Sequence, residues 1–308
     1  MSKIAVVTGA NQGLGFDLAE GLAQQLVPED VVYITGRSAD RVRIAAASIA
    51  APTAHVRGEV LDMRDGAAVS AFADSIAARH GGVDIVFSNA AARLTPSTPW
   101  AELVGPYVDT NNLGTTRLLR ALAPVLRPGG RLLVVASAFG SLRRLPAHLH
   151  QRFDTDTMSL DDVDCTMLDW RDAVIEGRAA EEGWPDWINI PSKVGQVAAV
   201  RVLARERRAA DLIDGTLVAA VCPGLVDTEA SRPWFENMAE AQTPSEAAVA
   251  PLRLALDRIA DPSFYGDESR SRRVESRRSG CSGGDLHEHA LAGAGVDAVV
   301  CFCDLLER

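Results

Sequence analysis

TGANQGLG, at residues 8–15, follows the apolar run KIAVVT and leads into a segment rich in alanine and leucine. Glycines in such a turn let the backbone reverse sharply and come close to a pyrophosphate, and the N–H groups that begin the next helix bind that anion. Because strand, turn and helix follow in this order, the stretch indicates a dinucleotide-binding unit rather than an ordinary tight turn. The residues predicted to hold the cofactor here are Gly9, Asn11, Gln12, Gly13, Leu14 and Gly15.

The alternation of β-branched runs with helical segments continues to about residue 225. We expect strands at 3–8, 31–35, 54–60, 83–88, 131–136 and 216–222, and helices at 13–26, 39–50, 66–79, 100–126, 190–209 and 245–260. Strand–helix–strand steps cross over right-handed, so the pattern predicts an α/β fold with a doubly wound parallel sheet of the Rossmann type. We assign residues 1–276 to this single domain, with ligands bound beyond the C-terminal strand ends.

Two segments depart from the alternation. Residues 138–188 carry an acidic run and the cluster WPDW, and we interpret them as an insertion with short helices of its own, lying over the site. Its tryptophans, at 170, 184 and 187, either form an aromatic wall of the site or hold the insertion in place by packing. Residues 277–308 are predicted to be a poorly ordered or loosely docked tail. The spacing of His287, His289, Cys301 and Cys303 in that tail matches no metal-ligand pattern, so no metal is expected.

The composition excludes some classes of partner. The chain has 308 residues, a formal net charge of −10 and a pI near 5.1, so nucleic acid and acidic membranes would repel it at long range. No apolar run is long enough to span a bilayer, and the sequence enters a strand pattern without a charged leader. Five unevenly spaced cysteines fit reduced thiols. We therefore expect a cytoplasmic protein whose partner is a small molecule.

The ends of the second and third strands bear on the choice of nucleotide. Arg37 stands where NAD-binding enzymes of this architecture place an acidic residue, and an arginine there accommodates a 2′-phosphate. This favours NADP(H) over NAD(H). The alternative is an ordinary surface arginine, since among the 31 basic residues lysine appears only as Lys3 and Lys193. Asp62, with Met63 beside it, is placed to accept from the adenine amino group, or else to cap the next helix.

These motifs make the chain resemble the short-chain dehydrogenase/reductases, and most of all the monomeric carbonyl reductases, over residues 3 to about 276. TGANQGLG matches the family's TGxxxGxG, and SNAA at 88–91 stands where the family has NNAG. The resemblance implies that Asn111, Ser137 and Lys193 occupy catalytic positions. It also implies that the nucleotide contacts Lys193 and the residues Asn89, Ala90, Pro223, Gly224, Val226 and Thr228. The long segment before Asn189 resembles the insertion that keeps carbonyl reductases monomeric, so we expect a monomer and leave a homodimer open.

One position departs from the family at the centre of its chemistry. The family's motif is Tyr-x-x-x-Lys, in which the lysine lowers the pKa of the phenol that donates the proton, whereas this chain has Asn189 four residues before Lys193. A carboxamide donates hydrogen bonds but does not release a proton near neutral pH. We therefore expect Ser137 and Asn189 to bind the carbonyl oxygen, while Lys193 and Asn111 hold the ribose and a proton-donating water.

Tyr107 is another side chain that could supply the proton. It precedes Asn111 by four residues on an expected helix, so the two side chains share a face. The simpler interpretation is a helix tyrosine packed against the sheet.

The predicted function is NADP(H)-dependent reduction of a ketone or aldehyde of a small molecule of secondary-metabolite type, in an atypical active site. The alternative is a redox-silent relative that binds a ligand or catalyses a cyclisation, dehydration or isomerisation with fixed dipoles. A third alternative, a pure interaction module, requires a cofactor site that binds nothing.

Overall fold

The computed structural model describes residues 2–257 and 299–301, which form a parallel sheet in the order β3-β2-β1-β4-β5-β6-β7. The strands are β1 (Ile4–Val7), β2 (Val31–Gly36), β3 (His55–Val60), β4 (Val83–Ser88), β5 (Leu126–Val135), β6 (Leu217–Cys222) and β7 (Val299–Cys301). The strand order reverses between β1 and β4, the place where open α/β sheets bind their ligands. The predicted doubly wound, Rossmann-type sheet is confirmed.

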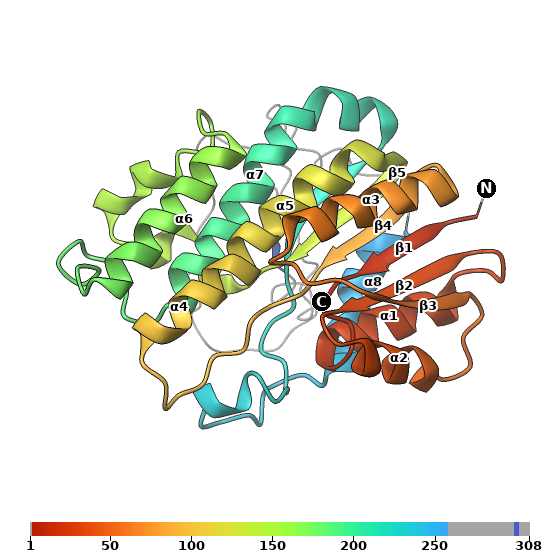
Figure 1. Cartoon of the computed structure of the whole chain (residues 1–308), viewed down its shortest axis with the longest axis horizontal. Coiled ribbons are helices and arrows are strands. Elements are labelled where there is room, and N and C mark those ends of the chain that lie inside the picture. Colours follow the sequence, from red (N-terminus) through yellow and green to blue (C-terminus); the bar gives the residue numbers. More distant parts are fainter. Residues whose placement is uncertain (1, 258–298, 302–308) are drawn as a thin grey trace, which may run out of the picture.

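Helices cover both faces of this sheet (Figure 1). On one face lie α1 (Gly13–Gln25), α2 (Ala39–Ser48) and α8 (Pro244–Leu256), and on the other lie α3 (Gly66–His80), α4 (Trp100–Val108), α5 (Gly114–Leu122) and α7 (Asn189–Asp214). The inner strands are apolar at nearly every position because both of their faces are buried. Two hydrophobic cores result, one on each side of the sheet.

The helix expected at 100–126 is not continuous. It is divided into α4, a π-helical turn η1 (Asp109–Leu113), α5 and the short 3₁₀ turn η2 (Ala123–Val125). A π-helical turn inserts one extra residue into the helical path, and such turns occur frequently at functional sites. Here the turn carries Asn111, which is fully buried.

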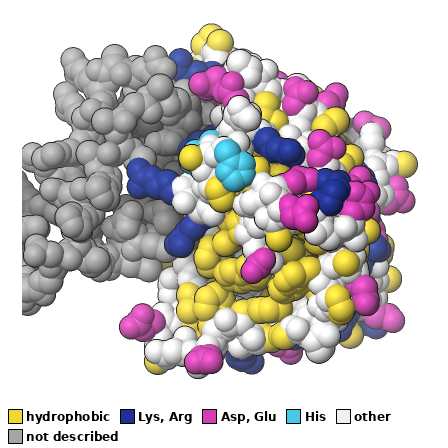
Figure 2. All heavy atoms as spheres, turned by 90° about the vertical axis from the view of Figure 1, so that its left-hand side faces the viewer, with side chains coloured by type: hydrophobic (Ala, Val, Ile, Leu, Met, Phe, Trp, Pro, Cys, Tyr) yellow, Lys and Arg dark blue, Asp and Glu magenta, His cyan; other side chains and the backbone are white. Residues whose placement is uncertain are grey.

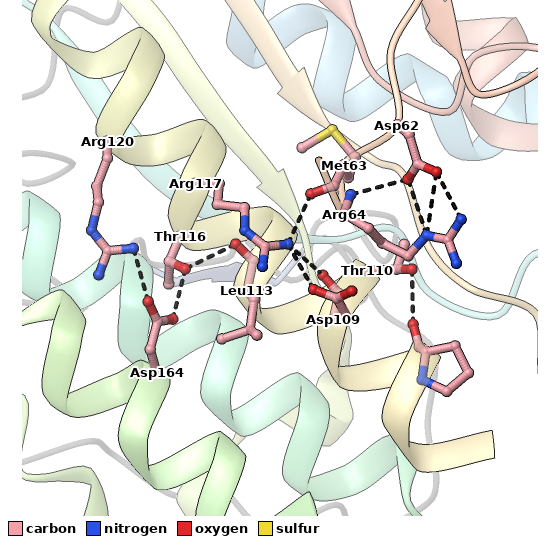
Figure 3. Close-up of polar contacts among 11 residues, drawn as sticks. Asp62, Met63, Arg64, Asp109, Thr110, Leu113, Thr116, Arg117, Arg120 and Asp164 are labelled. Carbon is pink, nitrogen blue, oxygen red and sulfur yellow. Dashed lines mark hydrogen bonds and ion pairs between the residues drawn. The ribbon is translucent and has the colours of Figure 1, made fainter. Parts of the chain in front are cut away.

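Most of residues 138–188 pack beside α4 and α7. The segment contains three 3₁₀ turns, η3 (Ala138–Gly140), η4 (Leu142–Arg144) and η5 (Ala147–Phe153), and the helix α6 (Leu160–Ile175). Asp164 on α6 accepts a hydrogen bond from Thr116 at 2.6 Å and pairs with Arg120 at 2.8 Å, which ties α6 to α5 (Figure 3). The sequence prediction placed the whole segment over the site, whereas only its two ends line the cavity described below.

The end of the chain adds a short strand that the sequence did not predict. β7 pairs in parallel with β6 at the edge of the sheet, with Ala220 opposite Val299. The rest of the predicted tail, including His287, His289 and Cys303, lies outside the described residues, as does the expected domain boundary at 276. Within residues 2–257, none of the helices has the length and apolar character needed to span a bilayer.

Candidate active site

A cavity of about 450 Å³ opens beyond the C-terminal ends of β4, β5 and β6. Its walls come from the loops that follow these strands, from α4 and η1, and from the start of α7. The lining is largely apolar, and Figure 2 shows hydrophobic side chains gathered in a hollow on this side of the molecule. All four residues predicted to be catalytic line the cavity: Asn111, Ser137, Asn189 and Lys193.

Asn111 has one end of its amide engaged. Its Oδ1 accepts a hydrogen bond from the backbone N–H of Ala92 at 2.8 Å, which fixes the loop after β4. Its Nδ2 is buried and has no hydrogen-bond partner among the described residues. A buried amide N–H without a partner costs free energy, so this donor is suited to a bound molecule or water in the cavity.

Ser137 follows the end of β5 in an extended conformation and begins η3. Its Oγ accepts a hydrogen bond from the backbone N–H of Phe139 at 3.3 Å. That contact uses the oxygen as an acceptor and leaves the hydroxyl proton free to donate to a ligand oxygen.

Lys193 lies on the first turns of α7, and its Nζ donates to the backbone oxygen of Val135 at 3.1 Å. Burial lowers the pKa of the Lys193 ammonium to about 8, because the charged form loses hydration there. The nearby Cys222 acts in the opposite direction, with a smaller effect on that pKa than burial has. The ammonium is therefore charged at neutral pH and becomes neutral within the alkaline range.

Asn189 begins α7, and its Oδ1 accepts a hydrogen bond from the hydroxyl of Tyr107 at 2.7 Å. Tyr107 is only 4 % exposed and packs in the core, as the simpler interpretation expected, yet it also lines the cavity. Burial raises the pKa of the Tyr107 phenol, and the neighbouring Asn111 and Ser192 side chains offset this only in part. Sequence reasoning named Tyr107 but gave no sign of its contact with Asn189.

The glycine-rich turn has the geometry that a pyrophosphate site needs. Gly9 has φ +61°, and a Cβ there would lie 2.7 Å from the Cα of Ala90, while a Cβ on Gly15 would lie 2.3 Å from Nδ2 of Asn89. Helix α1 begins at Gly13, and no side chain caps its first N–H groups. The turn thus leaves backbone donors open to an anion at a helix N-terminus.

Thr8 holds this turn against the end of β4, a role that sequence reasoning missed. Its Oγ1 accepts from the backbone N–H groups of Asn89 and Ala90, both at 3.0 Å. Asn89 in turn donates from Nδ2 to the backbone oxygen of Thr8 at 3.0 Å. These hydrogen bonds therefore join the glycine-rich turn, predicted to bind the pyrophosphate, to Asn89 and Ala90, which are also predicted to contact the nucleotide.

The ends of β2 and β3 lie further along the same edge of the sheet. Arg37 is exposed there, and Asp62 forms an ion pair with Arg64, with 2.8 Å between Nη2 and Oδ2 (Figure 3). The hydrogen bond from Arg64 lowers the pKa of Asp62, with a smaller contribution from Arg37. Asp65, not Asp62, caps α3, so the capping alternative for Asp62 is wrong. Sequence reasoning missed Arg64.

Met63 is held through its backbone. Its carbonyl oxygen accepts from Nη1 of Arg117 at 3.2 Å, and Arg117 also pairs with Asp109 at 2.7 Å (Figure 3). This connects the end of β3 to the π-helical turn that carries Asn111.

The loop after β6 closes the other side of the cavity. Gly224, Val226 and Thr228 line it, and Pro223 precedes them with its carbonyl accepting from Gln242 at 3.1 Å. A Cβ on Gly13 would lie 3.5 Å from Cγ2 of Thr228, so this loop borders the glycine-rich turn. Of the other residues predicted to bind the cofactor, Leu14 and Asn89 also line the cavity. Gly9, Asn11, Gln12, Gly13, Gly15, Arg37, Asp62, Met63 and Ala90 lie outside it.

The aromatic wall of the cavity is only partly the one considered from the sequence. Trp187 lines the cavity and contacts Phe139, with ring centroids 4.7 Å apart, and it also contacts Trp234 and Phe235. The indole N–H of Trp187 is buried and has no partner in the described part of the chain.

By contrast, Trp170 and Trp184 are buried against each other in the core and hold the inserted segment together. The sequence carried no signal for Phe139, Trp234 or Phe235.

Comparison with known proteins agrees with this architecture. Residues 3–147 match the family model of the short chain dehydrogenases. Carbonyl reductase [NADPH] 3 of Mus musculus is 32% identical over 266 residues, which cover 83% of this chain and 91% of that protein. Carbonyl reductase [NADPH] 1 of Mus musculus is 29% identical over 257 residues, covering 82% of this chain and 90% of that protein.

Solved structures show the same fold at lower sequence identity. Salutaridine reductase of Papaver somniferum has a TM-score of 0.68 at 24% identity, covering 83% of this chain and 96% of its own. Menthone neomenthol reductase of Mentha piperita has a TM-score of 0.66 at 22% identity, covering 83% of this chain and 94% of its own.

Proposed function

Because this chain belongs to the short-chain dehydrogenase family, we propose that it is an oxidoreductase that uses NADP(H) to reduce a ketone or aldehyde of a small molecule. The observation that carries the proposal is the convergence of Asn111, Ser137, Asn189 and Lys193 on one cavity. That cavity adjoins the glycine-rich turn at the point where the strand order reverses.

The residues present fit a phosphorylated dinucleotide. The open N-terminus of α1 and the positive φ of Gly9 suit the pyrophosphate, and Arg37 provides a cation for a 2′-phosphate. The loop after β6, from Pro223 to Thr228, borders the place where the nicotinamide would lie. NADPH, when bound, supplies the hydride. NADPH is also the cofactor in the names of the related carbonyl reductases, which supports this preference.

The side chains of the cavity provide hydrogen-bond donors for the developing oxyanion. Ser137 has a free hydroxyl proton and Asn189 has its Nδ2, and both can donate to the carbonyl oxygen as negative charge forms on it. Lys193 and the unpartnered Nδ2 of Asn111 hold the nicotinamide ribose and a water. In this arrangement that water, rather than a phenol at position 189, delivers the proton to the alkoxide.

The walls favour an apolar substrate with a flat or ring-shaped body. Phe139, Trp187, Trp234 and Phe235 form one side of the cavity, and the volume of about 450 Å³ suits a single small molecule. We propose that such compounds, of secondary-metabolite type, are reduced by a monomer in the cytoplasm.

The test is oxidation of NADPH by the purified protein with a panel of aryl and alicyclic ketones and aldehydes, followed by the loss of reduced-nicotinamide absorbance. We expect turnover with NADPH and much less with NADH. Tight NADPH binding in calorimetry without turnover of any carbonyl would contradict the proposal.

A second candidate rests on one observation, the absence of a proton-donating side chain at Asn189. A site made of fixed N–H and O–H donors stabilises an enolate or an oxyanion without redox chemistry. A redox-silent isomerase, cyclase or dehydratase would convert its substrate with no net consumption of NADPH. Product analysis by mass spectrometry with and without NADPH distinguishes this candidate from the reductase.

A further inference from the structure

Tyr107 and Asn189 come from different helices and meet inside the cavity. Tyr107 lies on α4 and Asn189 begins α7, and the phenol donates to Oδ1 of the amide at 2.7 Å. With its oxygen engaged, the amide has Nδ2 on its opposite side, and this nitrogen makes no hydrogen bond to the described residues. A carboxamide that is free to rotate would present either its oxygen or its nitrogen to a ligand, whereas this one is held.

We propose that Tyr107 is a positioning residue whose hydroxyl fixes the Asn189 amide so that Nδ2 faces the carbonyl oxygen of the substrate. A held hydrogen-bond donor thereby takes the place of the missing acid. The inference rests on the proposed carbonyl reduction and explains how Asn189 takes part in it.

Buried hydrogen bonds connect the two helical segments close to this pair. Asn112 donates from Nδ2 to the backbone oxygen of Ser192 at 2.8 Å, and Ser192 donates from Oγ to Oδ1 of Asn112 at 2.9 Å. Both residues are buried, and their two bonds join the π-helical turn η1 to the start of α7. A reciprocal buried pair of this kind holds the two helices in one register, so Tyr107 meets Asn189 in a set geometry.

The phenol acts as a donor and not as the acid. Burial raises the pKa of the Tyr107 phenol above its ordinary value, which favours the protonated hydroxyl that donates to Asn189. Lys193, which would lower that pKa if it lay against the phenol, instead donates to Val135. Because the Tyr107 hydroxyl is the donor, the amide oxygen of Asn189 turns toward the phenol. The amide N–H groups then turn toward the cavity.

Carbonyl reduction at this site needs no proton from a side chain of the protein. The carbonyl carbon gains the hydride from the reduced cofactor, and its π electrons move to the oxygen, which becomes an alkoxide. Asn189 Nδ2 and the Ser137 hydroxyl stabilise that alkoxide by hydrogen bonds. It then takes a proton from water, and solvent buffers the hydroxide that remains.

The first test compares Tyr107→Phe with a matched control, Tyr33→Phe. Tyr33 is also buried, and its hydroxyl forms a hydrogen bond with His80 at 2.8 Å, remote from the cavity. We expect Tyr107→Phe to lower kcat about tenfold, the value of one hydrogen bond, with the KM for NADPH unchanged. Tyr33→Phe should leave kcat within about twofold of wild type, since it removes a comparable bond outside the site.

The second test is a double-mutant cycle with Asn189→Ala. If Tyr107 acts through Asn189, the tenfold effect of Tyr107→Phe disappears when the amide is absent. Persistence of the full effect in the Asn189→Ala background would overturn the inference, because the phenol would then act directly or through the fold. Wild-type turnover with an unaffected Tyr107→Phe variant would overturn it as well while leaving the reductase proposal standing. Absence of carbonyl reduction in the wild type overturns the proposed function itself.

The third test removes the N–H donors of the Asn189 amide. It does not require the Tyr107→Phe variant to fold. Asn189→Asp keeps an acceptor for Tyr107 but removes both N–H groups at nearly constant volume. At about pH 8, where the carboxyl group is ionised, we expect kcat to fall about 100-fold or more, as for loss of an oxyanion donor. Activity within a few-fold of wild type would show that Nδ2 is not the group that faces the substrate.

Discussion

Lys193 reaches from α7 to the end of β5, where its Nζ lies 3.1 Å from the backbone oxygen of Val135. Val135 is the last residue of the strand that precedes Ser137, so this bond holds the ammonium beside the serine that faces the cavity. The side chain is half-buried there, and its charge depends on pH within the range in which an enzyme can be assayed.

Activity is expected to fall as the pH rises through about 8. Burial lowers the pKa of Lys193 to about 8, so the side chain is charged below that pH and neutral above it. If the cation holds the cofactor ribose, kcat/KM for NADPH declines about tenfold per pH unit above the pKa. Lys193→Arg keeps the charge at all accessible pH values, so its activity, although lower, should show a flatter alkaline limb. An equally steep limb in that variant would assign the titration to another group.

The nucleotide preference is expected to depend on Arg37. Replacing it with Gln removes the charge after β2 that is placed for a 2′-phosphate, and a charge-assisted hydrogen bond is worth about 10- to 100-fold in affinity. The Kd for NADPH should rise by that factor while the Kd for NADH stays constant. Arg41→Gln, at an exposed arginine on α2, is the control and should change neither Kd. An equal loss for both nucleotides would point to a general charge effect.

Gly9 is expected to tolerate no side chain. Its φ is +61°, and a Cβ would lie 2.7 Å from the Cα of Ala90, so Gly9→Ala should lower the free energy of unfolding by about 2–4 kcal/mol and abolish NADPH binding. Gly81→Ala is matched, because Gly81 also has a positive φ, +77°, but nothing lies within 4 Å of its Cβ position. Urea denaturation should show a loss of about 1 kcal/mol for that control. Equal losses in the two variants would mean that backbone strain alone, and not contact with Ala90, governs the turn.

Asn189→Tyr is expected to restore an acid. A phenol four residues before Lys193 lies one helical turn from a cation, which lowers its pKa, and a general acid contributes about 10²-fold or more to the rate. Asn189→Phe supplies the same ring without the hydroxyl. Carbonyl reduction should rise in the Tyr variant and not in the Phe variant. If both behave alike, the missing phenol is not what limits reduction. Loss of a native non-redox activity together with that gain would favour the redox-silent candidate.

Much of the fold follows from local pattern. The short β-branched runs around Val6, Val32 and Val86 become strands within a residue or so of their expected bounds, because nearly all-apolar segments of this length are stable only inside a covered sheet. The glycine-rich turn could also be predicted from local pattern. Its glycine spacing and its place between a strand and a helix are typical of a dinucleotide-binding turn.

The parts that sequence did not reveal depend on contacts across the chain. Tyr107 and Asn189 are separated by 82 residues, and no periodicity reports that their helices meet. The one local signal was the spacing of Tyr107 and Asn111, four residues apart on the helix that the sequence predicts at 100–126. The aromatic wall likewise joins Phe139, Trp187 and Trp234 from three separate segments of the chain. The strand Val299–Cys301 was missed because it is short and because no local pattern reports its pairing with β6, far away in the chain.

The π-helical turn between α4 and α5 has a consequence for how this site could arise or be lost. An α-helix advances about 100° per residue, so the one extra residue in Asp109–Leu113 rotates everything N-terminal to it by about that angle relative to a regular helix. Tyr107 lies before the turn and the buried pair of Asn112 and Ser192 holds the turn itself. A single-residue deletion between Val108 and Asn111 would therefore swing the phenol away from Asn189 without altering any residue in the cavity. The types of side chain in the cavity and the rotation of the helix that presents Tyr107 therefore depend on different residues of the chain.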